Sequence, residues 1–500
     1  MLGGRAGGCQ PGGPWLRMRL EAHHPPRRGK QRRITVRTES APSARWPGES
    51  TRHDARHAAK VERIARQLRR RRNTRPASFK KKTPSHQVPK RHDQRRQDEK
   101  IDLSDLDQIL EIDPVSMTCT AEPAVTFDEV VHETLRHGLV PIIVPEHKTI
   151  TLGGAVAGCS IESMSFRQGG FHDTCLEYEV ITAKGDVLRC TPDENPLVFQ
   201  MIHGSFGTLG VLSKLRFRLV RAAPYVHVTY ETHATLEAYQ RAIWRHFTAQ
   251  DADYLDGQIF SPTKHVLCVG RFAEQAPYVS RYDWLKAYCE SIPRRADDFL
   301  TVYDYLFRYD RGVTSVTPKS LVGRALFGKL VHSDSVLRAA DRFHRFLPAK
   351  SPKVIVDVFV PFSRTAEFMD WYHREIKHYP VWCVPYKRTR DYEWLTPRWW
   401  AGVQDPLFLD LAVYGLEQPP GRNIYKEFED ELLEVNGTKT LISYNYYDEQ
   451  TFWSLWNKET YQAVKQLTDP DNIFRDLYTK TCRAALGLGA QTPGSGGSLH

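Results

Sequence analysis

Two segments rich in glycine and small polar residues are places where the backbone can approach a ligand closely. Residues 149–175 read TITLGGAVAGCSIESMSFRQGGFHDTC, and residues 204–210 read GSFGTLG. Glycine permits close approach, and a series of free amide groups can hold a pyrophosphate. A spacing of roughly 50 residues suits a long dinucleotide lying between the two segments. The alternative is that these glycines only form tight turns, since the first segment lacks the G-x-G-x-x-G spacing of a Rossmann fold.

A second group of residues with chemical potential lies near the carboxyl terminus, in the sequence SYNYYD at 443–448. Tyr444 and Tyr446 are candidate proton donors, with Asn445 between them. On a strand these two tyrosines would face one side and Asn445 the other, so only one set can line a pocket. Packing in a core is the alternative for each tyrosine. Arg311 is a further candidate, because a guanidinium can hold a substrate group or a dinucleotide phosphate, although a surface ion pair explains it equally well.

The cysteine and histidine positions point away from a metal centre. The nine cysteines form no C-x-x-C pair and no His/Cys cluster at ligand spacing. We therefore expect no metal site, no disulfide framework and a reducing compartment.

The elements that must position these residues predict an α+β fold. Between residues 101 and 224, strands and helices intermix at short spacing. Thr126 and Glu129 form a capping box for a helix at 127–137, and Asn195 is expected to cap a helix that has Pro196 at its first position. The predicted strands are 117–122, 139–144, a hairpin of 176–183 and 187–190, and 211–220.

Residues 225–440 predict a second, mixed domain of helices and strands. The predicted helices are 235–248, 280–292, 336–346, 365–378 and 425–435. The predicted strands are 226–230, 266–271, 354–361, 380–385 and 407–414. Residues 441–486 form a closing segment, with a strand at 440–444 and helices at 449–467 and 470–484, and residues 487–500 a flexible tail.

The charge of the chain is unevenly distributed. Residues 1–100 hold 28 Lys and Arg against 8 Asp and Glu, so the rest of the chain is mildly acidic. We expect residues 1–50 to be a disordered basic extension and 57–72 a basic amphipathic helix, which can lie on an anionic membrane surface. A nucleic-acid-binding function is the weaker interpretation, because no aromatic residues interleave with the arginines. Without a signal-peptide pattern or a long apolar run, we expect a cytoplasmic or peripherally membrane-associated protein.

A set of ordered motifs resembles a known family. The sequence GxxxGxxIESxSxxxGxF matches residues 154–171 and RCTPxEN matches 189–195, with Gly185 and the GTLG at 207–210 in the same order. This pattern is similar to the FAD-binding PCMH-type domain of the vanillyl-alcohol oxidase superfamily, and most similar to the delta(24)-sterol reductase, or diminuto-like, family. The resemblance covers about residues 75–485 and is strongest over 100–220. It implies an FAD-binding domain at 51–224 (core 100–224) and a substrate domain at 225–440, with 441–486 completing the active site.

Carried over by position, the resemblance implies that FAD binds along both glycine segments. The pyrophosphate would lie near 151–154, and the ring and ribityl chain near 158–163 and 207–210. The implied contacts are Thr151, Leu152, Gly153, Gly154, Gly158, Ser160, Ile161, Glu162, Ser163, Gly169, Val180, Gly207, Thr208 and Gly210. The glycine-rich loop of many relatives corresponds here to residues 81–86, which lack glycine, so Lys82 and Ser85 are expected to supply charge and hydroxyl donors. His86 is a conceivable covalent attachment site, but the resemblance favours non-covalent FAD.

The resemblance implies a flavoprotein that reduces an isolated C=C bond of a sterol-like or other lipid substrate, with NADPH as reductant. The alternative is an FAD-dependent oxidase or dehydrogenase of an alcohol or another small polar substrate.

Overall fold

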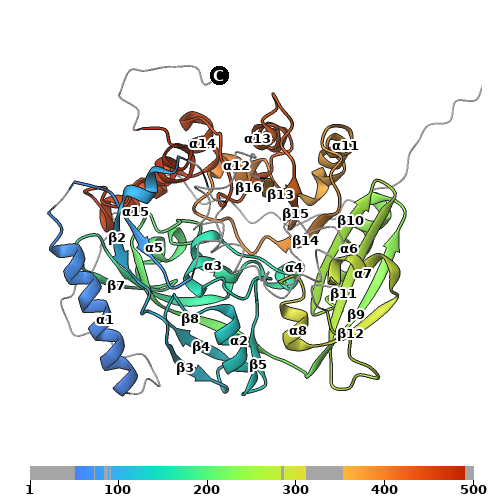
Figure 1. Ribbon diagram of the computed structural model, residues 1–500, viewed down its shortest axis with the longest axis horizontal. Helices are drawn as coiled ribbons and strands as arrows, with labels where there is room; N and C mark the ends of the chain where they lie inside the picture. The colour runs from blue at the N-terminus through green and yellow to red at the C-terminus, as the bar shows by residue number, and fades with distance from the viewer. Residues whose placement is uncertain are drawn as a thin grey trace, which may run out of the picture. The chain divides into compact units, whose positions relative to one another are not determined.

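The computed structural model describes residues 51–72, 74–83, 88, 90, 92–282, 287–310 and 353–489. Their strands form one two-stranded sheet and two large sheets, with helices between and around them (Figure 1). The predicted α+β fold is confirmed. The predicted extension at 1–50 and the predicted helix at 336–346 lie outside the described residues, and the predicted tail does so from residue 490.

The first large sheet comes from residues 109–221 and is antiparallel throughout. Its strands are β3 (Ile109–Asp113), β4 (Thr118–Ala121), β8 (Val211–Arg221), β6 (Cys175–Ile181) and β7 (Val187–Cys190), in that order, with β5 (Leu139–Pro141) also paired to β8. The predicted hairpin and the strands at 117–122 and 211–220 are confirmed, and the strand at 139–144 is confirmed over its first three residues. Beside this sheet, β1 (Ala77–Lys80) and β2 (Glu99–Asp102) form a parallel pair.

Four short helices accompany this sheet: α2 (Phe127–Leu135), α3 (Leu152–Gly158), α4 (Ser165–Gln168) and α5 (Pro196–Met201). The capping box predicted for α2 is confirmed, because the Thr126 hydroxyl accepts the Glu129 amide and the Glu129 carboxylate accepts the Thr126 amide. Asn195 and Pro196 lie at the cap and first positions of α5, as predicted, but the Asn195 side chain makes no capping bond. Its backbone is left-handed, with φ of 49°, and its side chain donates to the Arg189 carbonyl instead.

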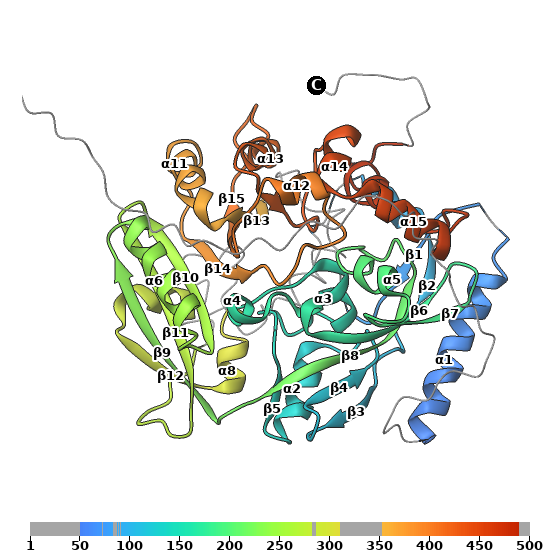
Figure 2. The ribbon, with the colours of Figure 1, turned by 180° about the vertical axis from the view of Figure 1, so that it is seen from behind.

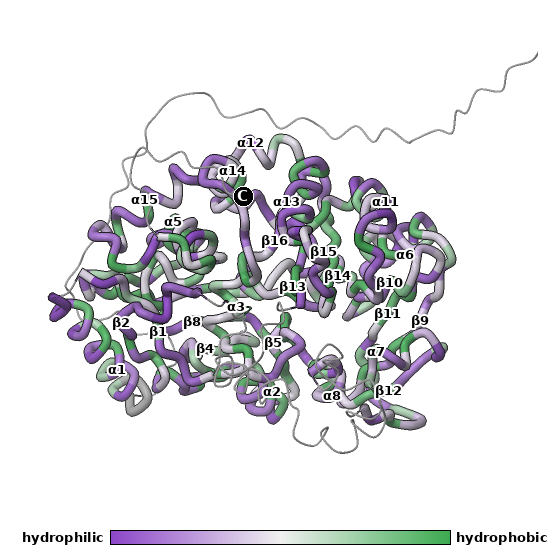
Figure 3. Tube along the Cα trace, turned by 45° about the horizontal axis from the view of Figure 1, so that its top comes forward, coloured by the Kyte–Doolittle hydropathy of each residue, from purple (hydrophilic) through white to green (hydrophobic). Residues whose placement is uncertain are grey.

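The basic amphipathic helix predicted at 57–72 is α1 (Thr51–Arg69), and its apolar face is covered. Ile64 and Leu68 are buried in a cluster that includes Ile181 and Phe474. Figure 3 shows hydrophilic and hydrophobic residues alternating along this helix. Buried His57 fastens it further, since its ring nitrogens lie 2.8 Å from Glu122 Oε1 and 2.9 Å from Glu179 Oε1.

The second large sheet has eight strands, all antiparallel to their neighbours. In order they are β12 (Asp297–Thr301), β9 (Tyr225–His233), β11 (Lys264–Ala273), β10 (Tyr254–Ser261), β14 (Val381–Lys387), β15 (Leu407–Leu416), β13 (Val354–Pro361) and β16 (Thr438–Lys439). The strands predicted at 226–230, 266–271, 354–361, 380–385 and 407–414 are confirmed.

The two faces of this sheet differ in composition. One face is apolar and packs against α6 (Leu236–Ala249), α11 (Thr365–Glu375) and α13 (Ile424–Glu434), as Figure 2 shows from behind. These helices confirm the predictions at 235–248, 365–378 and 425–435. On the other face, Trp382, Val384 and Ala412 pack against Ile161, whereas α4 contacts β14 and β10 and its Phe166 belongs to the cluster of the helix-covered face. α3 and α4 lie between the two large sheets in both views. The glycine-rich segment therefore faces the inner side of this sheet.

Four predicted elements of the second half are wrong in whole or in part. Residues 440–444 form turns instead of a strand, because the Asn445 side-chain amide bonds the carbonyls of Leu441 and Ser443. Of the predicted helix at 280–292, residues 283–286 lie outside the described residues; Tyr288–Ser291 form α7, and Ser280 is not helical, since its amide bonds the Phe299 carbonyl of β12.

Near the carboxyl terminus the helical content is lower than predicted. The helix at 449–467 is split into α14 (Glu449–Leu455) and α15 (Lys458–Thr468). The helix at 470–484 is wrong over its first half, because the Asp469 carboxylate accepts the amides of Ile473 and Phe474 and holds them in a turn. Only Thr479–Arg483 and Ala484–Leu486 are helical there. Within the described parts of the chain, no helix combines the length and the apolar character needed to cross a bilayer.

Candidate functional site

The first glycine segment begins at the amino terminus of α3, where the backbone amides already have partners. The amides of Leu152 and Gly153 donate to the carbonyls of Val125 and Pro123, each at 2.9 Å, and the Gly154 amide donates to the Thr151 hydroxyl. A Cβ on Gly153 would lie 2.6 Å from Pro123 Cβ. Thr151–Gly154 therefore dock α3 onto the preceding loop, and these amides are not free for a pyrophosphate.

The other end of α3 is open. A Cβ added to Gly158 would meet no atom within 4 Å, and the next residue, Cys159, turns the chain with φ of 54°. The chain then passes Ser160 and Ile161 and is fixed to the second large sheet, where the Leu255 amide donates to the Ser163 carbonyl at 2.7 Å. Gly158 is thus the glycine of this segment that leaves space beside the backbone.

The second glycine segment lies against the first. The amides of Gly204 and Phe206 donate to the carbonyls of Val156 and Ala157 in α3. A Cβ on Gly207 would lie 2.4 Å from the ring of Phe79 in β1. The structure therefore brings together the two loops that the sequence singled out.

A cavity of about 100 Å³ lies where the two loops meet the inner face of the second sheet. Gly158, Ile161, Gly204 and Phe206 form one side of it. The remaining wall is mostly aromatic and includes Phe359, Tyr386, Tyr392, Trp394, Trp399, Trp400, Phe408 and Trp456. Apart from Cys159, its titratable lining groups are His172, Lys439 and two tyrosines.

Buried carboxylates are distributed over the inner face of this sheet. Asp256 Oδ2 accepts the Tyr309 hydroxyl at 2.8 Å and the Trp382 indole at 2.9 Å. Arg308, itself fully buried, reaches Asp256 Oδ1 at 3.1 Å and Glu162 Oε1 at 2.8 Å. Burial raises the pKa of Glu162 to about 7, and its Oε2 has no hydrogen-bond partner among the described residues. Glu162 is thus held in place by one oxygen with the other oxygen unused.

Two further carboxylates lie on neighbouring strands, Asp357 in β13 and Asp410 in β15. The Tyr414 hydroxyl donates to Asp357 Oδ1 at 2.7 Å. Burial raises the pKa of Asp357 to about 6 and raises the pKa of Asp410 well above its usual range. The buried Asp410 Oδ1 has no partner within the part of the chain that the structure describes.

The sequence analysis missed Arg308 and all three of these sheet aspartates. A signal for the aspartates does exist, because each is the one charge in an apolar strand sequence: YLDGQIF, VIVDVFV and LFLDLAV. An acidic residue in a buried strand is costly unless it has a function or a partner. For Arg308 the sequence offers no comparable signal.

His172 and Asp173 connect the first glycine segment to the aromatic wall. Asp173 accepts hydrogen bonds from the Gly170 amide and the hydroxyls of Thr389 and Tyr392 at 2.8 to 2.9 Å. Burial lowers the pKa of His172, and neither of its ring nitrogens has a hydrogen bond from the described residues, although Nε2 lies 3.2 Å from Asp173 Oδ2. A buried polar ring at a cavity with unused hydrogen-bonding capacity indicates a missing ligand.

Lys480, beside the second glycine segment, carries poorly compensated charge. Its Nζ donates to the Phe206 carbonyl at 2.7 Å. Burial, with Arg95 acting in the same direction, lowers the pKa of Lys480 to about 7. Its ammonium makes no ion pair with a carboxylate of the described residues, although Asp98 acts on it from a greater distance. An unpaired ammonium beside a flavin-binding loop fits the diphosphate of a dinucleotide, so the residues present fit FAD.

The predicted site residues fall into three groups. The first group lies in the two loops described above: Ser160, Ile161, Glu162, Ser163, Gly207 and Thr208. Gly169 follows α4. Val180 packs against Gly210, because a Cβ added to Gly210 would lie 2.9 Å from the Val180 side chain. Lys82 is close to that region, but its ammonium is paired with Glu129 at 2.7 Å and Asp107 at 3.2 Å. Ser85, His86 and Arg311 lie outside the described residues.

The predicted donors Tyr444, Asn445 and Tyr446 do not line the cavity. The rings of Tyr444 and Tyr446 pack beside Tyr425 on the helix-covered face of the second sheet. Asn445 is buried and its amide bonds three backbone carbonyls, which is a structural role. Residues 441–445 form turns instead of the expected strand, and in this arrangement the rings of both tyrosines lie away from the cavity.

Comparisons with known proteins agree with this geometry. A model of a family described as FAD binding domain matches residues 85–191. The delta(24)-sterol reductase of Homo sapiens is 24% identical over 412 residues, covering 77% of this chain and 78% of the relative. The delta(24)-sterol reductase of Arabidopsis thaliana is 24% identical over 428 residues, covering 76% of each. Cytokinin dehydrogenase 10 of Oryza sativa subsp. japonica is 29% identical over 135 residues, covering 26% of this chain and 24% of the relative.

The family match covers the first glycine segment and α3, and the longer matches extend well beyond its last residue, 191. The chain is therefore an FAD-dependent oxidoreductase that carries a PCMH-type FAD-binding domain and is similar in sequence to the delta(24)-sterol reductases.

Proposed function

We propose that the protein reduces an isolated carbon–carbon double bond of a sterol-like or other lipid substrate, with NADPH as the electron donor. The aromatic cavity is the observation that carries this proposal. Its wall presents four tryptophan rings beside phenylalanine and tyrosine rings, and its glycine side belongs to the FAD-binding loops. A flat apolar molecule matches such a wall better than a sugar or a small alcohol does.

The cofactor and the protein residues have different roles in this site. When bound, FAD supplies the hydride chemistry, and the protein must position the substrate, exclude water and provide a proton. Trp394, Trp399 and Trp400 exclude water from the cavity. Lys480, beside the second glycine segment, provides positive charge for the cofactor's diphosphate. The names of the delta(24)-sterol reductase relatives support a sterol-like substrate and the reductive direction.

The cavity as it stands is smaller than the roughly 300 to 1,000 Å³ of pockets that hold drug-sized molecules. Binding of the flavin and a lipid together therefore requires aromatic side chains to rearrange. The stacked pair of Tyr392 and Trp394, with ring centres 4.2 Å apart, lies at the wall and is the first candidate to separate.

We further propose that FAD is held non-covalently and that contact with a membrane is peripheral. Because the apolar face of α1 is buried, such contact would use its exposed arginines, Arg66 and Arg69, and not insertion. Binding to anionic vesicles that disappears at high salt supports this contact, and equal binding to neutral vesicles contradicts it.

The function is tested by separating its two half-reactions. The purified protein is reduced with NADPH without oxygen, and the loss of the flavin absorbance is followed. A sterol with an isolated side-chain double bond is then added, and return of the absorbance with formation of the saturated product is the expected result. Oxygen consumption with small polar alcohols, without reduction by NADPH, would overturn the proposal in favour of an oxidase. Release of the flavin on denaturation tests the non-covalent attachment.

A further inference from the structure

The inner face of the second sheet holds one acidic side chain that the proposed function has not yet used. Asp410 lies in the middle of β15 and is 97% buried. It makes no hydrogen bond or ion pair with any described residue, and its Oδ1 is fully shielded from solvent. A buried carboxylate of this kind would cost several kcal/mol, so the group is stable there only as a neutral acid or with a ligand.

The position of Asp410 relates it directly to the aromatic cavity. In the register of the sheet it is opposite Phe359 of β13, and it lies two residues from Phe408 on the same face of β15. Phe408 in turn is opposite Tyr386 of β14. Phe359, Phe408 and Tyr386 all line the cavity. Asp410 therefore lies next to lining residues of the cavity on the same face of the sheet, and this face packs against Ile161 of the flavin-binding segment.

Burial and the charges around Asp410 keep it protonated. Burial raises the pKa of Asp410 well above its usual range, and Asp357 on the neighbouring strand, Glu146 and Glu162 act in the same direction. Three basic groups of this region are engaged by other carboxylates. Arg308 is paired with Glu162 and Asp256, Lys439 is paired with Glu429 at 2.7 Å, and His147 lies 3.3 Å from Glu146.

We propose that Asp410 is the catalytic acid that delivers the proton to the substrate double bond. This inference rests on the proposed function, which supplies the substrate and the hydride. The π bond of the alkene is broken, one carbon takes the hydride as the reduced flavin is oxidised, and the other takes the carboxylic acid proton of Asp410, so that two C–H bonds form. Asp410 is left as a carboxylate.

A route exists for returning the proton to Asp410. Asp357 is its diagonal neighbour across the β13 and β15 pair, close enough for side chains to interact. The Tyr414 hydroxyl donates to Asp357 at 2.7 Å, and Tyr414 is partly exposed near the end of β15. Solvent protons can therefore reach Asp410 through Tyr414 and Asp357 between turnovers.

The test compares Asp410→Asn with a matched control, Asp430→Asn, on the FAD-loaded protein. Asp430 lies on the outer face of α13 in an exposed pair with Lys426. Both variants are reduced with NADPH and then mixed with the sterol alkene without oxygen. We expect Asp410→Asn to be reduced at the normal rate but to return electrons to the alkene about 100- to 10,000-fold more slowly, the usual contribution of a general acid. The control should behave as wild type in both steps.

A second measurement does not depend on turnover. Infrared spectroscopy of the resting protein at neutral pH should show the C=O stretch of a protonated carboxylic acid that disappears in Asp410→Asn and persists in Asp430→Asn. An unchanged band, or an unchanged alkene step in Asp410→Asn, overturns the assignment while wild-type turnover leaves the proposed function standing. If the wild-type protein does not reduce the alkene although the band is assigned to Asp410, the proposed function is wrong and the donor role falls with it.

Discussion

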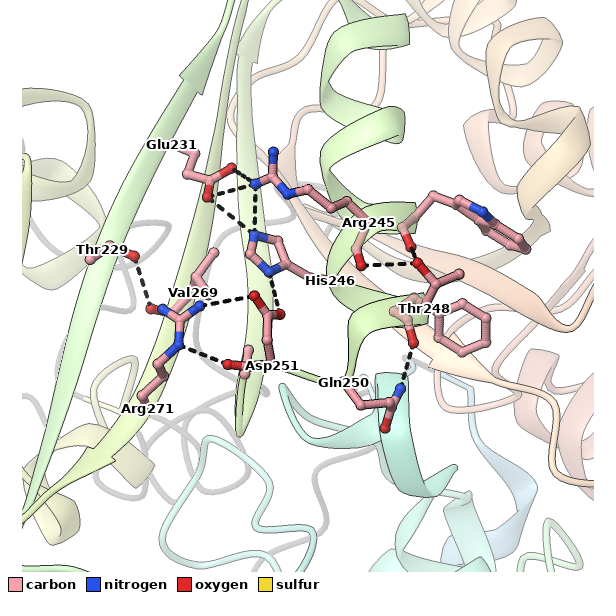
Figure 4. A network of polar contacts seen from close by, with 12 residues as sticks. Thr229, Glu231, Arg245, His246, Thr248, Gln250, Asp251, Val269 and Arg271 are labelled. Atoms are coloured by element: carbon pink, nitrogen blue, oxygen red, sulfur yellow. Dashed lines mark hydrogen bonds and ion pairs between the residues drawn. The ribbon is translucent and has the colours of Figure 1, made fainter.

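Two clusters of charged and polar side chains in the second sheet are built from the same residue types but differ in pairing. In the first, the ring nitrogens of His246 in α6 lie 2.7 Å from Asp251 Oδ1 and 3.1 Å from Glu231 Oε1, and Arg245 and Arg271 neutralise the same two carboxylates (Figure 4). In the second, His172 lines the aromatic cavity, and Glu162 and Asp410 lie close to residues that line it; Glu162 Oε2, Asp410 Oδ1 and the ring nitrogens of His172 have no hydrogen-bond partners in the described chain. The first cluster is a closed structural network, whereas the second has capacity left for a ligand.

The difference teaches how to separate structural from functional polar groups in this protein. Buried polar atoms in folded proteins are nearly always hydrogen-bonded, so those left unused near a cavity identify where a cofactor or substrate completes the structure. The same distinction applies to the lysines, since Lys465 is paired with Asp469 at 2.6 Å while Lys480 makes no ion pair with a carboxylate of the described residues. The predictions below test whether this distinction holds.

Replacing Lys480 with Met should have the largest effect on cofactor binding. Loss of one charge-assisted contact is worth about 1.5 to 3 kcal/mol, so FAD affinity should fall about 10- to 100-fold. The apoprotein should be as stable as wild type or more stable, because a poorly compensated cation is removed. Fluorescence titration with FAD and urea unfolding of the apoprotein measure the two effects.

Lys458→Met is the control for this variant, because Lys458 makes an exposed pair with Glu449 at 3.5 Å. Equal weakening of FAD binding in both variants, or a large loss of apoprotein stability in Lys480→Met, would show that Lys480 is a structural residue.

The two ends of α3 provide the next test, because they contain a structural glycine and an open one. Gly153→Ala should lower the free energy of unfolding by about 1 to 3 kcal/mol, since its Cβ would be 2.6 Å from Pro123. Gly158→Ala should leave stability unchanged or raise it, because its Cβ meets nothing, yet it should weaken FAD binding about tenfold. The result that breaks the comparison is a Gly158→Ala protein that binds FAD as wild type does.

The smallest effects are expected from pH, with opposite signs for the two histidines. Hydrogen bonds to Glu231 and Asp251 raise the pKa of His246, so its stabilisation is complete below about pH 6.5 and is lost as pH rises through the raised pKa. Burial lowers the pKa of His172, so the folded state binds its proton less well and stability is lost as pH falls below about 6.5.

Urea unfolding of the apoprotein between about pH 5 and 8 checks both signs. In His246→Gln, the free energy of unfolding should fall less as pH rises than it does in the wild type. The difference should be less than about 1 kcal/mol, because the partners of His246 are exposed. In His172→Gln, the free energy of unfolding should fall less as pH is lowered than it does in the wild type. A variant that changes the opposite side of the curve would refute the pairing assigned to that histidine.

Much of the fold could be predicted from local sequence patterns. The capping box at Thr126 and Glu129 and the hairpin around Gly185 are set by residues within a few positions of one another, and both are confirmed. The turn after Thr440 was not predictable in this way. The amide of Asn445 holds it by bonding Leu441, Ser443 and the distant Thr481, so a tertiary contact overrides the alternating pattern.

The candidate site could be predicted only in part for the same reason. The glycine spacing indicated both loops, but it could not separate Gly153, which is packed, from Gly158, which is open. That difference depends on Pro123, whose position is fixed by the fold. Arg308 and Asp410 are far from the glycine segments in sequence. The tertiary fold brings them close, as the ion pair between Arg308 and Glu162 and the strand order of the second sheet show.

The central claim is that His172 at the cavity and Lys480 at the second glycine segment contact FAD when it binds, and equilibrium unfolding with and without the cofactor tests it most directly. If FAD completes this site, an FAD concentration 100 times the dissociation constant should stabilise the apoprotein by about 2.7 kcal/mol, with quenching of the tryptophan fluorescence of the cavity wall. Stabilisation should be reduced in Lys480→Met and unchanged in Lys458→Met. An apoprotein whose unfolding and fluorescence do not respond to FAD would contradict the account.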